Sequence, residues 1–373
     1  MSQPLPTYRY PLFRLDMPGL DDLRTPLADI WRRGWFTNNG PVARAYEAAV
    51  ARFYHCDPEQ VVTTCNATTG LLLAARTVLE QGHTAWVPAF TFPPTVQALR
   101  WSGIPYKYGD IRADSLELDL QIALVQTALR NLMITAPLGC WSDVQSDTMR
   151  YFGGVVLDAA ASLGRFMPRA LVWADVIVFS LHATKPLGAC EGGVLICKTK
   201  QLADEIRQRA NFGLDEFGQV EYPYGLNGKL DEINAAIALH KLAWRDRVFE
   251  RAEILGELYK RELRGADFYS PVYDGLQQPL NFFPVYVDHA LEVEAALKRR
   301  GILSRRYYQA LHKMRVEACD YTPPSLPVTE AVASKILVLP MHTNFRCKDI
   351  EFIVHALVEV REELAKREAR KLT

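Results

Sequence analysis

The stretch of sequence that decides the fold runs from Val155 to Gly193 and is VVLDAAASLGRFMPRALVWADVIVFSLHATKPLGACEGG. Two short apolar runs in it have the composition of buried strands. The first run ends in Asp158, and the second leads through Ser180 to Lys185. In sheets of parallel strands, ligands bind beyond the carboxyl ends of the strands. We therefore expect the carboxylate of Asp158 and the amine of Lys185 to face one site.

Strand-like and helix-like segments alternate along the chain around this stretch. Short apolar runs typical of strands are found at residues 61–64, 85–87, 106–108, 132–135 and 193–197. Segments with helical periodicity precede or separate them, at residues 21–33, 42–54, 71–79, 94–101 and 118–129. This alternation predicts an α/β fold, in which a mainly parallel sheet is covered by helices on both faces.

The last third of the chain has a different pattern. Residues 230–262 have helical periodicity throughout and predict one long helix or two abutting helices. Beyond them, strands are predicted at 282–287, 302–308 and 336–339, and helices at 291–300 and 348–366. At 373 residues the chain exceeds one typical domain. We expect a large domain with an N-terminal arm over residues 1–245, and a smaller α+β domain over residues 246–373.

The overall composition narrows the classes of partner. The chain has 43 basic and 43 acidic residues, so no net field favours nucleic acid or an anionic membrane. Seven cysteines are scattered singly without metal-ligand spacing, which predicts no metal site. No apolar run approaches the ~20 residues that span a membrane, and no signal peptide is recognisable at the start. We expect a soluble, cytoplasmic protein.

The pair of Asp158 and Lys185 points to a specific chemistry. Pyridoxal phosphate (PLP) needs a lysine that forms a Schiff base with its aldehyde, and an acid that keeps its ring nitrogen protonated. A lysine at the mouth of a buried sheet has its pKa lowered by desolvation, which suits imine formation. Taken alone, Asp158 is also compatible with capping a helix that starts at Ala159.

Three further features fit the same cofactor. The small-residue turn at 66–70 precedes a predicted helix, and a helix N-terminus binds phosphate through its backbone amides. Ser180 offers a second hydroxyl beside the end of the lysine strand. Phe92 follows another predicted strand, where an aromatic side chain can stack on a flat ring. Each feature also has an ordinary structural reading: an N-cap for the turn, and a core residue for Phe92.

Seven short motifs occur in a fixed order along the chain. They are residues 34–41 (GWFTNNGP), 66–71 (NATTGL), 88–92 (PAFTF), 158–160 (DAA), 180–185 (SLHATK), 191–193 (EGG) and 225–232 (GLNGKLDE). With them the chain resembles the DegT/DnrJ/StrS family of nucleotide-sugar aminotransferases over essentially its whole length. These are PLP-dependent transferases of fold type I, the aspartate-aminotransferase fold. The retained Lys185 disfavours the related sugar dehydratases, which carry histidine there.

The resemblance implies a homodimer with two active sites shared between the subunits. In it, Lys185 and Asp158 are the catalytic residues, and Phe92 stacks on the cofactor ring. The phosphate is held by Ala67, Thr68 and Ser180, while Asn227 comes from the neighbouring chain. The resemblance further implies a substrate site made of His182, Glu191, Arg306, Tyr307, Tyr308 and His312. A basic surface segment is the alternative reading of the arginine and tyrosines.

The reaction implied is transfer of an amino group from glutamate to the keto carbon, most simply C4, of a nucleotide-linked 4-keto-6-deoxy sugar. The product would serve amino-sugar and surface-glycan biosynthesis, such as that of lipopolysaccharide. One departure from the family pattern is Ala161, which stands where a Gln or His usually contacts the cofactor. Two alternatives therefore stay open: a PLP enzyme that acts on a C3-keto sugar or a cyclitol, and a catalytically impaired regulatory protein that binds the cofactor.

Overall fold

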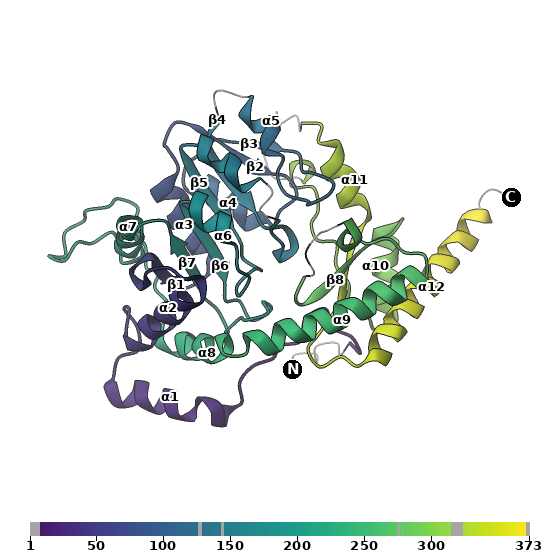
Figure 1. Cartoon of the computed structure of the whole chain (residues 1–373), viewed down its shortest axis with the longest axis horizontal. Coiled ribbons are helices and arrows are strands. Elements are labelled where there is room, and N and C mark those ends of the chain that lie inside the picture. The colour runs from purple at the N-terminus through teal and green to yellow at the C-terminus, as the bar shows by residue number, and fades with distance from the viewer. Residues whose placement is uncertain are drawn as a thin grey trace, which may run out of the picture.

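The computed structural model describes residues 8–125, 129–142, 145–274, 277, 279–314 and 324–370. Two sheets organise this part of the chain, a large one in the first two thirds and a small one near the C-terminus. Helix α9 (Arg245–Gly265) runs from one region to the other, along the lower edge of the view in Figure 1. The predicted boundary between residues 245 and 246 falls at the start of this helix and stays a prediction.

The large sheet has seven strands and is mainly parallel, as predicted. Its order is β1-β7-β6-β5-β4-β2-β3, and β7 alone runs antiparallel to its neighbours β1 and β6. The strands are β1 (Val61–Thr64), β2 (Thr84–Pro88), β3 (Tyr106–Gly109), β4 (Leu129–Thr135), β5 (Gly154–Asp158), β6 (Val176–Ser180) and β7 (Gly193–Cys197). Their registers place Thr135 beside Asp158, and Ser180 beside Gly193.

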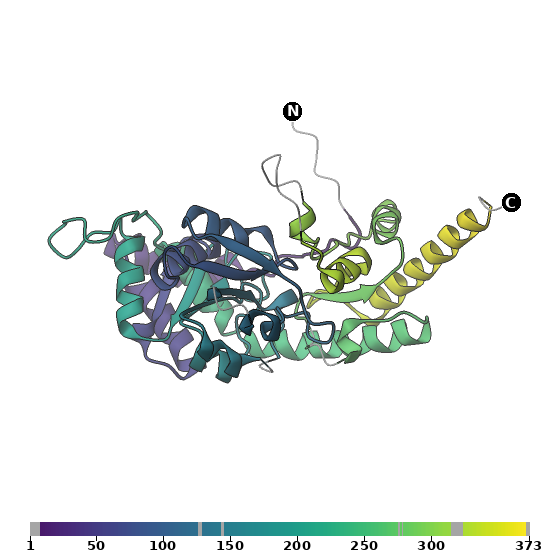
Figure 2. The same cartoon turned by 90° about the horizontal axis from the view of Figure 1, so that it is seen from above.

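Helices cover both faces of this sheet (Figure 2). They are α1 (Leu20–Arg33), α2 (Pro41–Tyr54), α3 (Ala67–Val78), α4 (Pro93–Trp101), α5 (Leu120–Leu124), α6 (Pro168–Trp173), α7 (Lys200–Ala210) and α8 (Glu232–Leu242). Short 3₁₀ turns are found at η1 (Pro58–Gln60), η2 (Pro137–Gly139) and η3 (Ser146–Tyr151).

Two predicted helices differ in extent from those observed. Helix α3 begins at Ala67, four residues before the predicted start, because Asn66 caps it by accepting a hydrogen bond from the Thr69 amide (2.8 Å). The helix predicted over 118–129 is observed only as α5, and Leu129 already belongs to β4. Residues 126–128 of that prediction lie outside the described residues.

The C-terminal region packs helices on a two-stranded antiparallel sheet, β8 (Phe282–Tyr286) with β9 (Ile336–Pro340). Its other elements are α10 (Ala290–Arg299), α11 (Pro327–Lys335), α12 (Cys347–Ala369) and the turns η4 (Pro271–Asp274) and η5 (Leu311–Lys313). The strand predicted over 302–308 is wrong. That segment makes only single bridges, from Ile302 to Tyr10 and from Arg305 to Val338, because two different segments flank it.

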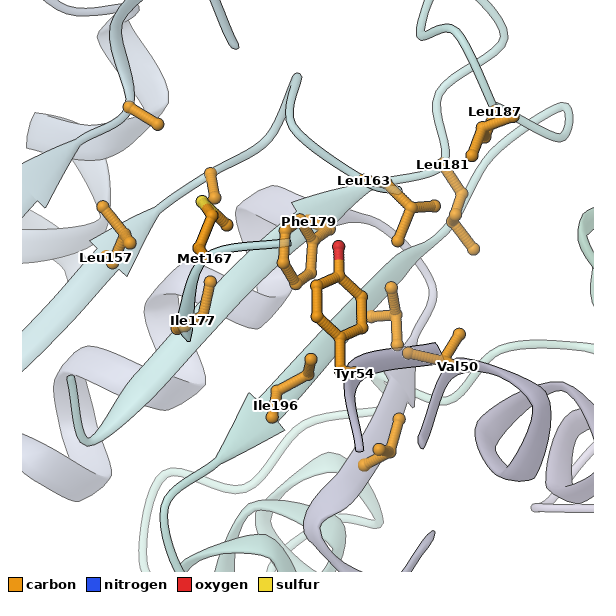
Figure 3. Close-up of a cluster of buried hydrophobic side chains, with 14 of the residues drawn as sticks. Val50, Tyr54, Leu157, Leu163, Met167, Ile177, Phe179, Leu181, Leu187 and Ile196 are labelled. Carbon is orange, nitrogen blue, oxygen red and sulfur yellow. The ribbon is translucent and has the colours of Figure 1, made fainter. Parts of the chain in front are cut away.

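The face of the sheet towards α2 is packed with large side chains. Figure 3 shows Tyr54 of α2 lying against Phe179 of β6, and their rings stack at 5.3 Å. The buried hydroxyl of Tyr54 accepts a hydrogen bond from the backbone N–H of Gly164 (3.0 Å). Burying each such aromatic side chain contributes roughly 2–3 kcal/mol. This packing fixes β6, whose carboxyl end leads to Lys185.

Two of the family-like motifs meet away from the cavity described below. The buried carboxylate of Glu232 accepts hydrogen bonds from the backbone amides of Val42 and Ala43, both at 2.8 Å. It thereby satisfies the N-terminus of α2. A Cβ atom at Gly40 would lie 2.6 Å from the Glu232 carboxyl carbon, so glycine is needed there. The pairing of motifs 34–41 and 225–232 is therefore structural.

His342 fastens the N-terminal arm to the C-terminal region and makes stability depend on pH. Its Nδ1 accepts from the Arg14 amide (3.0 Å), and its Nε2 lies 2.6 Å from the Pro11 carbonyl, which suits the neutral ring. Burial lowers the pKa of His342 from 6.5 to about 4. A lowered pKa in the folded state gives stability that is present above pH 6.5 and is lost as the pH falls towards 4.

We expect the free energy of unfolding to fall by roughly 2 kcal/mol between pH 7 and pH 5 through this group. Urea unfolding at the two pH values measures the change. In a His342→Gln variant the loss over the same interval should be smaller by that amount. An equal loss in the variant and the wild type would show that His342 is not responsible.

Candidate active site

A cavity of about 660 Å³ opens at the carboxyl ends of the parallel strands. Residues from β5, β6, the N-terminus of α3, the N-terminal arm and the C-terminal region line it. Ten of the thirteen predicted site residues are among them: Ala67, Thr68, Phe92, Asp158, Ser180, His182, Lys185, Glu191, Tyr307 and Tyr308.

Asp158 is the last residue of β5 and is 5% exposed. One carboxylate oxygen accepts a hydrogen bond from the hydroxyl of Thr95 (2.7 Å), and the other accepts from the Ala160 amide (3.1 Å). Burial raises the pKa of Asp158, while these two donors and the nearby Lys185 act in the opposite direction. Asp158 is thus a buried acid whose ionised form the surrounding donors favour.

Lys185 lies in a loop that folds back between β6 and β7. The backbone of the loop is held by a hydrogen bond from the Lys185 amide to the His182 carbonyl (2.8 Å) and by one from the Asn281 side chain to the Thr184 carbonyl (2.7 Å). Burial lowers the pKa of Lys185, and Asp158 partly opposes the shift. A lowered pKa raises the fraction of neutral amine, which is the nucleophilic form.

A corner suited to an anion lies where β6, β7 and α3 meet. Ser180 pairs in register with Gly193, and Gly193 pairs with Thr64, which leads into the turn before α3. The first-turn amides of α3, at Ala67 and Thr68, have no acceptor within the helix and lie at the cavity wall. Together with the positive end of the helix dipole they suit a phosphate.

Gly193 permits this close approach. A Cβ atom there would lie 2.6 Å from the Thr64 hydroxyl and 2.8 Å from the Ala67 amide nitrogen. We expect Gly193→Ala to push the turn at Ala67 away, to cost about 1–3 kcal/mol of stability and to weaken phosphate-cofactor binding at least about tenfold. Fluorescence titration with the cofactor measures the affinity. The matched control is Gly265→Ala in α9, where a Cβ meets no atom within 4 Å; equal affinity in both variants would contradict the expectation.

Aromatic rings form one wall of the cavity. The ring of Phe92 is half exposed and lies 6.4 Å from those of Tyr307 and Tyr308. Tyr308 also contacts Phe90 edge-on at 5.4 Å. Burial raises the pKa of both tyrosines, so their phenols stay neutral at physiological pH. A flat apolar surface with two neutral phenols suits an aromatic ring or a sugar face.

His182 and Glu191 lie together at the mouth of the cavity. His182 Nδ1 accepts a hydrogen bond from the Thr184 amide (3.2 Å), and its Nε2 lies 3.6 Å from a Glu191 carboxylate oxygen. With Nδ1 as the acceptor, the Nε2–H of the neutral ring is the donor that faces Glu191. Both side chains are about half exposed, so a substrate entering the cavity can reach them.

Three predicted residues do not line the cavity. The side chain of Arg306 pairs with Glu294 (3.1 Å), and buried His312 lies 3.2 Å from a Glu330 carboxylate oxygen. Within one chain, neither side chain lines the cavity, although both were expected in the substrate site. Asn227 is exposed on the loop between α7 and α8.

Five polar or aromatic residues of the cavity were not predicted from the sequence: Phe13, Thr135, Thr184, Asn281 and Phe282. Thr135 ends β4 beside Asp158, and a strand end was a usable signal for it. Asn281 and Phe13 come from the C-terminal region and the N-terminal arm, and no local pattern marks them. Among the described residues no cluster of three or more metal-ligating side chains is found, and no helix is long and apolar enough to cross a membrane.

The sheet order, the partly buried Lys185 beside the buried Asp158, and the corner suited to a phosphate fit an α/β enzyme of the transferase class. The chain belongs to the DegT/DnrJ/EryC1/StrS aminotransferase family, whose sequence model matches residues 21–358. This confirms the family and the enzyme class expected from the motifs.

Known proteins of the same fold and family support this assignment. A dTDP-4-amino-4,6-dideoxy-D-glucose transaminase from Escherichia coli is 26% identical over 90% of this chain and 94% of its own length. The crystal structure of DesI with its TDP-sugar product is 29% identical, with a TM-score of 0.83 over 99% of this chain and 96% of that one. A Bacillus cereus protein assigned as a PLP-dependent aminotransferase is 25% identical, with a TM-score of 0.84 over 93% and 99% of the chains. The predicted fold type I architecture is confirmed.

Proposed function

We propose that this protein transfers an amino group from glutamate to the C4 keto carbon of a nucleotide-linked 4-keto-6-deoxy sugar, with PLP as cofactor. The observation that supports it most is the placement of a partly buried amine, Lys185, and a buried acid, Asp158, on the wall of one cavity. The Escherichia coli relative is named for a dTDP-linked amino sugar, and DesI was crystallised with its TDP-sugar product, which supports a nucleotide-sugar acceptor.

The residues present fit this cofactor. When bound, PLP supplies an aldehyde that bonds a lysine amine and a pyridinium ring that accepts electrons from the substrate. Lys185 has the lowered pKa that such bonding needs, and Asp158 would hold the ring nitrogen. Ala67, Thr68 and Ser180 would hold the phosphate, and Phe92 would face the ring.

Each of the chain's own groups then has a defined task. Lys185 Nζ would take a proton from the substrate carbon and later give one up, so that it acts first as a general base and then as a general acid. The carboxylate of Asp158 would supply a negative charge on the wall of the cavity, where the ring nitrogen of the cofactor would lie. His182, Glu191, Tyr307 and Tyr308 would orient the sugar, because they line the outer part of the same cavity.

The charges of the cavity support a shared site in a homodimer. Among the described residues that line it, Lys185 is the only lysine and there is no arginine. Glutamate and a nucleotide sugar are anions, so further cations must come from outside this lining. The segment between α7 and α8, which carries Asn227, projects from the large domain and exposes Phe217 and Tyr224 (Figure 1). We propose that it reaches a partner subunit's cavity.

A two-stage spectroscopic assay tests the proposal. Purified protein with PLP should be yellow and should lose this colour when glutamate is added in the absence of an acceptor. Adding a 4-keto-6-deoxy sugar nucleotide should then restore the colour and yield an aminated sugar by mass spectrometry. Retention of the yellow colour in excess glutamate would contradict the claim that glutamate is the amino donor. Failure of every 4-keto sugar to restore the colour would contradict the claim that such a sugar is the acceptor.

The same assay separates the alternatives that the sequence left open. Recovery of colour with a C3-keto sugar or a cyclitol ketone, but not with 4-keto sugars, would identify a different acceptor. A protein that binds PLP but keeps its yellow colour with every amine donor tested would be a regulatory homologue. The cytoplasmic location and the role in surface-glycan synthesis belong to the proposal and depend on the acceptor found.

A further inference from the structure

A chain of buried hydroxyl groups ends on the carboxylate of Asp158. Thr95 donates to Asp158 Oδ2 at 2.7 Å, the hydroxyls of Thr95 and Thr91 are 2.8 Å apart, and those of Thr91 and Thr135 are 2.8 Å apart. Thr91 and Thr95 are fully buried, and Thr135 is 6% exposed. Four elements contribute: the segment after β2, the first turn of α4, the end of β4 and the end of β5.

The direction of these bonds follows from the chemistry of the groups. A carboxylate can only accept, so Thr95 must give its single proton to Asp158. Thr95 can then only accept from Thr91, and Thr91 in turn can only accept from Thr135. All three donors therefore point towards Asp158, and each bond polarises the next in the same direction.

We propose that Thr95, supported by Thr91 and Thr135, is a positioning residue that holds Asp158 as an ionised carboxylate directed into the cavity. This inference rests on the proposed role of Asp158 opposite the cofactor ring nitrogen. If Asp158 lost these donors it would become a stronger base. It would then draw the proton from the ring nitrogen to itself and leave the ring a poorer electron acceptor.

The other groups that face Asp158 do not replace the hydrogen bonds of the three threonine hydroxyls. The Ala160 amide donates to Oδ1 at 3.1 Å, and Lys185 acts at longer range. Tyr308 interacts electrostatically with Asp158, and a neutral phenol adds no positive charge. Thr95 also lies in the first turn of α4, whose positive end favours an anion. Thr95 is thus the side-chain donor in contact with the carboxylate.

The first test is the titration of Asp158 in the cofactor-free protein. The carboxyl carbons of aspartate are labelled with ¹³C, and the Asp158 resonance is assigned as the one missing from an Asp158→Asn variant. We expect the midpoint in Thr95→Val to rise by about one to two pH units, because a hydrogen bond to a charged group is lost. Thr95→Ser should restore it, and Thr91→Val should raise it by about half a unit.

A matched control is available in α3. The hydroxyl of Thr77 is buried and has no hydrogen-bond partner in the described part of the chain, so Thr77→Val removes the same group without touching Asp158. It should leave the midpoint unchanged. Equal midpoints in wild type, Thr95→Val and Thr91→Val would overturn the proposal. If Thr95→Val does not fold, Thr91→Val and Thr95→Ser decide the matter.

The second readout uses the holoenzyme with ¹⁵N in the cofactor ring. In wild type the ring nitrogen should have the chemical shift of a pyridinium. In Thr95→Val the equilibrium should move roughly ten- to a hundredfold towards the neutral pyridine. A pyridinium shift unchanged in Thr95→Val would overturn the link to the cofactor. A protein that fails to bind PLP would refute the proposed function, while the first titration would still decide the role of Thr95.

Discussion

Replacing Lys185 with alanine is expected to lower the rate of amine transfer by at least about 10⁴-fold and to abolish the yellow colour with PLP. In the proposed function, Lys185 supplies both the amine that bonds the cofactor and the group that moves the proton, and general acid–base catalysis alone contributes about 10²–10⁴-fold. Its partly buried position and lowered pKa suit it to both tasks. Stopped-flow absorbance after adding glutamate measures the rate, and ultraviolet–visible spectra measure the colour.

The control is Lys200→Ala, which removes an exposed lysine that pairs with Glu59 on the surface at 2.9 Å. Exposed pairs contribute little to stability, so this variant should keep the colour and the rate of the wild type. Lys185→Arg adds a second comparison, because it keeps a positive charge but cannot bond the aldehyde. A yellow, active Lys185→Ala protein would show that another lysine binds the cofactor.

Asp158→Asn is expected to lower the rate of amine transfer by about 10²–10³-fold while PLP still binds. The amide keeps the shape of the side chain but removes the negative charge that, in the proposed function, Asp158 places opposite the ring nitrogen. Losses of this size are typical when one preorganised electrostatic contact is removed. Both carboxylate oxygens already accept a hydrogen bond, so the amide NH₂ would also face a donor. Single-turnover kinetics with glutamate measure the effect.

Asp175 provides the matched control for this variant. Asp175 directly precedes β6, at the end of the sheet opposite to Asp158. Its carboxylate accepts a hydrogen bond from the amide of Val155 at the start of β5 (2.9 Å). Asp175→Asn keeps an acceptor there and should leave the rate within about threefold of the wild type. Equal rates in Asp158→Asn and in wild type would remove the carboxylate from the proposed chemistry.

The sequence predicted well the features that follow from strand ends. Asp158 and Ser180 end buried strands, and the pattern of apolar runs located both strands within one or two residues. The start of α3 was missed because Thr68, Thr69 and Gly70 have low helix propensity. Tertiary packing decides it: a Cβ at Gly70 would lie 2.9 Å from Leu195, so the small residue lets the helix lie close on the sheet.

The sequence could not predict which residues reach the site through contacts between segments that are distant in the chain. Asn281 reaches the loop of Lys185 only because β8 lies across the cavity from it. Arg306 and His312 were expected in the substrate site, yet each has a carboxylate partner on a helix, Glu294 on α10 and Glu330 on α11. Such pairings are set by tertiary contacts and leave no local pattern in the chain.

A crystal structure of the protein with PLP bound tests the central claim most directly. We predict continuous electron density between the cofactor and Lys185 Nζ, with the ring nitrogen within hydrogen-bond distance of Asp158. The phosphate should lie at the turn formed by Asn66 and Ala67. A cofactor bound elsewhere, or one in this cavity whose ring nitrogen points away from Asp158, would contradict the account.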